Sequence, residues 1–259
     1  MSRGHSMEYY LNLSASHAVW CGIVLFAASY IRGFSGFGFT AILMTGLTLI
    51  LPIAEVVPVS IALEIIASLG QSYSIRRHVH WRRLFILLSA GAICTPVGVY
   101  LLALLPDVTL RGLVLAFIFA TSVYLLISQK HLHDFKTGTV LLAGAVIGVV
   151  NGATALSGMV LALFLSLSNE SPARIRATMI AFLFLADVWA GGLLFASGFY
   201  DSATFYRIAF SLPLLGLGVW LGSMHFASAP PDIFRKAVLW LLLVLSVFGI
   251  IMAMSAQFV

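Results

Sequence analysis

The stretch Ile31-Arg32-Gly33-Phe34-Ser35-Gly36-Phe37-Gly38-Phe39-Thr40 decides how this chain folds. It lies inside an apolar run that extends from about residue 17 to residue 51. A glycine in a helix interior is about 1 kcal/mol less favourable than an alanine, and an arginine at the centre of a bilayer costs about 2.5 to 3.5 kcal/mol. A segment selected only to cross a membrane has no use for this combination, so the pattern predicts a helix that is broken for a functional reason.

A second interrupted run, 137–167, contains Gly148-Val149-Val150-Asn151-Gly152-Ala153-Thr154-Ala155-Leu156-Ser157-Gly158. Three more apolar segments follow each run in the same order: about 56–75, 84–105 and 111–128 in the first case, and about 177–197, 207–226 and 237–256 in the second. Pro96-Val97-Gly98-Val99-Tyr100-Leu101 is matched by Gly216-Leu217-Gly218-Val219-Trp220-Leu221. We therefore predict two related four-segment halves, 1–128 and 137–259, joined by a polar linker, 129–136; such repeats are typical of secondary transporters.

The composition predicts an all-α polytopic membrane protein. Only 9% of the residues are charged and 61% are hydrophobic, whereas soluble domains carry about 25% charged residues. The apolar runs are continuous, unlike the short alternating strands of a membrane β-barrel. We expect 8 to 10 membrane segments in the cell (cytoplasmic) membrane, with the lipid bilayer as the main partner; a homodimer stays open.

The basic residues lie between the apolar runs, so the net charge of +5 follows the positive-inside rule and does not indicate nucleic-acid binding. Counting each interrupted run as one crossing places 8 of the 14 Lys and Arg residues inside. Letting each run enter and return, as two crossings or as a re-entrant hairpin, places 11 of the 14 inside. The second topology fits the rule better and makes the two halves inverted repeats.

No pattern indicates catalysis, a metal or a cofactor. Cys21 and Cys94 both lie in apolar segments, and the histidines match no metal-ligand spacing. No Ser/His/Asp or Cys/His set has a plausible catalytic context. We expect a protein that is not an enzyme and that needs no cofactor.

The two interruptions are the predicted anion site. Broken helices would expose backbone N–H groups and half-helix N-termini to a cavity, where they could hold an oxyanion. The alternative is that the glycines only permit close helix packing. The candidate substrate-binding residues are Arg32, Gly33, Ser35, Gly36, Gly38, Thr40, Asn151, Gly152, Thr154, Ser157 and Gly158.

Charged residues within the apolar segments carry further hypotheses. Arg32 either supplies the positive charge of the anion site or anchors a helix end at the interface. Glu64 and Asp187 occupy the same relative segment of each half, and an intramembrane carboxylate is a functional hypothesis by default. They either carry protons for coupling or pair with a buried cation such as Arg32 to hold helices together. Gln71 is a candidate cavity-lining residue.

The glycine-rich break, its counterpart in the second half, the basic loop after the second segment (residues 76–83) and the four-plus-four order resemble the sulfite exporter TauE/SafE family. The resemblance covers about residues 20–255, although Phe39-Thr40 stands where the family commonly has further glycine. It implies a transporter, generally an exporter, of sulfite, other sulfur oxyanions or organosulfonates. An anion channel and a membrane-embedded enzyme or assembly component are the alternatives.

Overall fold

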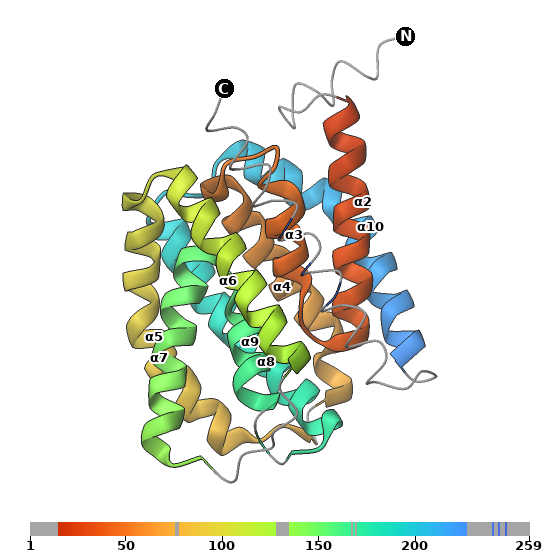
Figure 1. The fold of residues 1–259 in the computed structure, drawn as a ribbon. Coiled ribbons are helices and arrows are strands. Elements are labelled where there is room, and N and C mark those ends of the chain that lie inside the picture. The colour runs from red at the N-terminus through yellow and green to blue at the C-terminus, as the bar shows by residue number, and fades with distance from the viewer. Residues whose placement is uncertain are drawn as a thin grey trace.

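The computed structural model describes residues 15–75, 78–127, 135–166, 168 and 170–226, together with the single positions 240, 243 and 247. Within these residues the chain forms nine helices and no strand (Figure 1). Six of these helices are long and apolar enough to cross a membrane. The helices are α2 (Ala15–Ser35), α3 (Phe39–Leu47), α4 (Ile53–Ile75), α5 (Trp81–Leu104), α6 (Asp107–Ile127), α7 (Thr137–Thr154), α8 (Ser157–Ser166), α9 (Pro172–Ala196) and α10 (Ser202–Phe226). The predicted last segment, most of the linker and part of the basic loop lie outside the described residues.

Both predicted interruptions are present. The first run divides into α2 and α3, and the second divides into α7 and α8. The Arg32–Gly38 stretch lies near the middle of the first run and predicts two pieces of about 15 residues each, but the pieces are unequal, because α2 has 21 residues and α3 has 9. At 1.5 Å per residue, α3 is roughly 14 Å long, about half the hydrocarbon thickness of a bilayer. The short helices are therefore half-helices that end inside the bundle.

The start of α9 also corrects a prediction. Residues 168–176 read as a polar loop, but α9 begins at Pro172 and includes Arg174 and Arg176. The Ser171 side chain accepts a hydrogen bond from the Arg174 backbone N–H, and Pro172 takes the first helical position. Ser before Pro is a common helix start, so the sequence contained this signal.

Two pairs of helices pack closely through glycines, one pair on each side of the bundle (Figure 1). Helices α5 and α7 run parallel: Gly91 meets Gly144 and Gly148, and Gly98 meets Gly152. Helices α2 and α10 also run parallel, because residues 22, 30 and 34 of α2 lie against residues 214, 218 and 222 of α10 in that order. In each pair, the first helix of one half packs on the third long helix of the other half.

Helices α4 and α9 cross the middle of the bundle in opposite directions. Tyr200, just after α9, donates a hydrogen bond to the Pro58 carbonyl, near the start of α4. Gly191 lies against Ile61 and Ile65, further along α4. The main hydrophobic core takes residues from both of these helices and from α3, all nine residues of which are buried. The half-helices are therefore held between the two glycine-packed pairs.

Candidate functional site

The backbone itself makes both helix breaks. Gly36 and Gly38 have positive φ angles of 80° and 89°, and Gly38 is the residue that caps α3. In the second half, Ala155 takes the corresponding left-handed conformation with φ 57°. Glycine adopts this conformation readily, but it is uncommon for a residue with a side chain. The second break is therefore maintained against the backbone preference of its own residue.

The two breaks meet at one small cavity. It is lined by the first turns of α3 and α8, with one side chain each from α4 and α9: Gly38, Thr40, Ala41, Glu64, Ala155, Leu156, Gly158, Met159 and Leu183. The first N–H groups of a helix have no partner within the helix, and the helix dipole is positive at that end. Two such ends face this cavity, which measures about 10 Å³, about the smallest space that holds one water.

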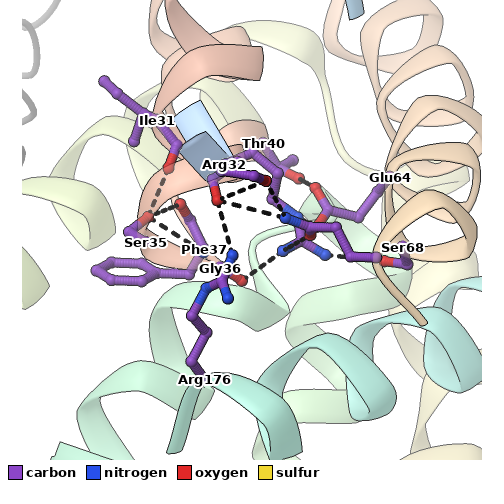
Figure 2. Close-up of polar contacts among 12 residues, drawn as sticks. Ile31, Arg32, Ser35, Gly36, Phe37, Thr40, Glu64, Ser68 and Arg176 are labelled. Carbon is purple, nitrogen blue, oxygen red and sulfur yellow. Dashed lines mark hydrogen bonds and ion pairs between the residues drawn. The ribbon is translucent and has the colours of Figure 1, made fainter. Parts of the chain in front are cut away.

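Arg32 does not line this cavity, but it contacts Glu64, which does (Figure 2). Its guanidinium is fully buried, and its Nε pairs with the Glu64 carboxylate. The other donors reach the Ser68 hydroxyl at 2.8 Å, the Gln71 amide oxygen at 3.3 Å and the Gly36 carbonyl at 2.7 Å. The second Glu64 oxygen accepts a hydrogen bond from Thr40 at 3.4 Å. Glu64 thus joins the arginine to a residue of the cavity wall.

A second cluster closes the bundle near the end of α2. The Gly33 carbonyl accepts hydrogen bonds from Gln71 (3.3 Å), Ser223 (3.2 Å) and Arg176 (2.8 Å). The Arg176 side chain also packs against Gly36, because a Cβ placed there would lie 2.8 Å from it. Four helices, α2, α4, α9 and α10, are therefore tied together on this side of Arg32.

The second half carries a different polar pair. Asn151 on α7 donates a hydrogen bond from Nδ2 to the Asp187 carboxylate on α9 at 3.1 Å. The exposed fractions of Asn151 and Asp187 are 1% and 2%. The Asn151 Oδ1 and the Ser157 hydroxyl, at the start of α8, are buried and have no hydrogen-bond partner in the structure.

Two further cavities lie between the long helices. One, of about 240 Å³, lies between α2, α3, α4 and α10 and is largely apolar. One end of this cavity is lined by the Arg207–Glu55 ion pair (2.6 Å), where α4 and α10 begin. Its lining also includes Leu43 and Leu63, which are close in sequence to Thr40 and Glu64. The other, between α5, α7 and α9, measures only about 10 Å³.

The remaining candidates have local roles. Ser35 and Thr154 donate hydrogen bonds to carbonyls one turn back in their own helices, at Ile31 and Val150. Gly33 and Gly152 are contact points between helices.

Sequence reasoning did not single out Ser68 and Ser223. Ser68 could have been found, because Glu64, Ser68 and Gln71 are spaced i, i+4 and i+7 and so share one helix face. The partner of Ser223 lies in the other half of the chain, and no local pattern indicates it.

Two groups outside the membrane-spanning segments have shifted pKa values. Burial raises the pKa of Tyr200 to about 12. Hydrogen bonds from the Thr204 hydroxyl and backbone N–H lower the pKa of Asp201. Asp201 thereby caps the start of α10.

Long apolar helices, two broken helices and buried charged groups between them define a polytopic helical membrane protein of the transporter class. The model of the family described as sulfite exporter TauE/SafE matches residues 21–249, and the chain belongs to that family. Searches of the curated proteins and of the solved structures gave no match.

Proposed function

We propose that the protein moves small anions, such as sulfite, other sulfur oxyanions or organosulfonates, across the cell membrane by alternating access. The anion would bind between the first turns of α3 and α8. The meeting of two half-helix N-termini inside the bundle is the observation that carries this proposal. The substrate class and the outward direction rest on membership of the sulfite exporter family.

The chemistry of this site suits an oxyanion with several acceptor oxygens. The first turns of α3 and α8 offer backbone N–H groups, and helix N-termini favour negative charge. Thr40 adds a hydroxyl that donates to Glu64 in this state and would turn to the bound anion, and Ser157 begins α8 with a buried hydroxyl that has no partner among the described residues. An anion that accepted a hydrogen bond from Ser157 would satisfy that group.

The size of the cavity supports a moving mechanism rather than a fixed pore. A space of about 10 Å³ holds no more than one water, so a sulfite-sized anion enters only if the half-helices separate. A channel would need a continuous open path, whereas the hydrogen bonds that Gln71, Arg176 and Ser223 donate to the Gly33 carbonyl tie four helices together, which supports a closed end in this state.

We further propose that the halves are inverted repeats within a bundle of 8 to 10 membrane segments. The directions of the helices support this arrangement. A repeat axis along the membrane normal would make the equivalent helices α4 and α9 parallel, whereas they are antiparallel. An axis in the membrane plane also accounts for the parallel pairs α2/α10 and α5/α7.

The two cavities between the long helices differ in volume, and this difference suggests how access to the anion site would alternate. The cavity of about 240 Å³ in the α2, α3, α4 and α10 region would be the access path open in this state. Its equivalent between α5, α7 and α9 is closed. In the opposite state the two cavities would exchange roles. Glu64 and Asp187, both buried near the site, would couple this exchange to protons.

Thermal unfolding of the purified full-length protein against a panel of anions tests the binding site. A ligand at one hundred times its Kd stabilises the folded state by about 2.7 kcal/mol. We expect sulfite, thiosulfate or a short sulfonate to raise the unfolding temperature, and short carboxylates to have little effect. The Ser157→Ala variant should lose much of this shift, and the exposed Ser89→Ala variant should keep it. A flat response across the panel would contradict the proposal.

A further inference from the structure

Each half places a hydrogen-bond donor just before a glycine in the last turn of the helix that precedes its break, and bonds this donor to a carboxylate of the next long helix. In the first half Arg32 precedes Gly33 and pairs with Glu64. In the second half Asn151 precedes Gly152 and bonds Asp187. The structure thus repeats one arrangement with a cation in one half and a neutral amide in the other.

The two donors are equivalent in the fold as well as in the sequence. A Cβ on Gly33 would lie 2.3 Å from the Val219 carbonyl oxygen, and a Cβ on Gly152 would lie 2.8 Å from the Val99 backbone nitrogen. Val99 and Val219 occupy the same position in the matched Gly-Val pairs of α5 and α10. Each break then turns through a positive φ three residues after its glycine, at Gly36 and at Ala155.

The exchange of arginine for asparagine changes the charge balance. Arg32 pairs directly with Glu64 and compensates its charge. Asp187 makes no ion pair within the described part of the chain. The charged groups that act on it are Glu64 on α4 and Arg32 on α2. The titratable Tyr200, in the segment after α9, also interacts with it electrostatically and donates its own hydrogen to the Pro58 carbonyl. The ionised form of a buried carboxyl group without its own cation is strongly disfavoured, because no ion pair offsets the free-energy cost of removing the charge from water.

The amide partner indicates how Asp187 avoids this penalty. The Asn151 Oδ1 is buried and has no donor among the residues that the structure describes, and an unpaired buried acceptor needs an explanation. An ionised carboxylate can only accept hydrogen bonds, whereas a protonated one also donates. If Asp187 carries a proton, its O–H can donate to the Asn151 Oδ1 while its other oxygen accepts from the Asn151 Nδ2. Both groups are then satisfied.

We propose that Asp187 is the proton-carrying residue of the transport cycle, that it is protonated in the state seen here, and that Glu64 is a permanently ionised partner of Arg32. This inference rests on the proposed function. The proposed function lets Glu64 and Asp187 share the proton coupling, whereas the inference assigns it to Asp187 alone. Protonation removes a negative charge near the anion site. Proton and anion therefore favour each other's binding, and this coupling is reciprocal.

Infrared difference spectroscopy on the full-length protein in lipid tests the protonation directly. At neutral pH the wild type should show the C=O stretching band of a protonated, buried carboxyl group. The band should be lost in Asp187→Asn and kept in Glu64→Gln. In Asn151→Leu the band should shift in frequency, because the carboxyl loses its amide partner. A band that survives in Asp187→Asn, or that is lost in Glu64→Gln, overturns the proposal.

The pH dependence of anion binding supplies a second readout. In the wild type, sulfite should stabilise the protein more as the pH falls, and in Asp187→Asn the stabilisation should no longer follow pH. Equal pH dependence in the two proteins would overturn the coupling. If sulfite and the other anions fail to bind the wild type at any pH, the proposed function fails, and the infrared band still decides which carboxyl holds the proton.

Discussion

The contact between α5 and α7 allows a worked prediction. A Cβ on Gly98 would lie 2.1 Å from the Val149 carbonyl oxygen, whereas ordinary contacts begin at 3.4 Å. The atoms nearest to this Cβ all belong to the backbone of α7 and not to a flexible side chain. The Gly98→Ala variant therefore forces the backbones of α5 and α7 to separate by roughly 1.3 Å. Overpacking of this kind costs about 1 to 3 kcal/mol, and it outweighs the gain of up to about 1 kcal/mol that alanine brings to a helix.

The assay is thermal unfolding of detergent-purified protein, with Gly216→Ala as the matched control. Gly216 is also inside a helix, but nothing lies within 4 Å of the added Cβ. The control should unfold at or above the wild-type temperature, and Gly98→Ala should unfold well below it. If both variants unfold at the same temperature, close glycine packing does not hold α5 and α7 together.

Three other predictions follow from particular contacts. Arg32→Gln should destabilise the protein by about 3 to 5 kcal/mol, because it leaves the buried Glu64 charge uncompensated; adding Glu64→Gln should recover part of this loss in the same unfolding assay, and additive losses would refute the pairing. Asp201→Ala should lower the unfolding temperature through loss of a helix cap worth about 0.5 to 2 kcal/mol. Because the Asp201 pKa is lowered in the fold, this contribution is present above the pKa of the unfolded aspartate and disappears as the pH falls through the folded value, so wild type and variant should converge in acid; a difference that persists in acid would count against the cap. A charged, membrane-impermeant thiol reagent should label Cys21, which lines the larger cavity, in Cys94→Ser faster than it labels Cys94 in Cys21→Ser; equal rates would mean that this cavity is closed to water.

Much of the fold could be predicted because its signals are local. Apolar runs, the two glycine-rich interruptions and the matched order of segments each depend on neighbouring residues. The unequal division of the first run was not predictable from glycine positions alone. Arg32 and Gly33 remain helical because their side of α2 is packed against α4 and α10, and the chain turns only where Gly36 and Gly38 adopt positive φ.

The sequence indicated which charged residues are candidates for the site, but it did not indicate which of them contact one another. Glu64 and Asp187 stand out as carboxylates in apolar segments, and the sequence left open whether Arg32 pairs with one of them. Only the packing of α2 on α4 brings Arg32 to Glu64. The contact of Arg176 was not predictable either, because it depends on the Ser171 cap, which starts α9 early enough to direct this arginine to the Gly33 carbonyl.

The most direct test of the central claim is sulfite flux through proteoliposomes that contain the full-length protein. The wild type and Ser89→Ala should show the same saturable flux. Thr40→Val, which keeps the side-chain shape and removes the hydroxyl, and Ser157→Ala should raise the half-saturating sulfite concentration roughly tenfold or more, since a hydrogen bond to a charged group contributes about 1.5 to 3 kcal/mol. Saturable flux that is unchanged in both variants would show that the anion does not pass between the first turns of α3 and α8.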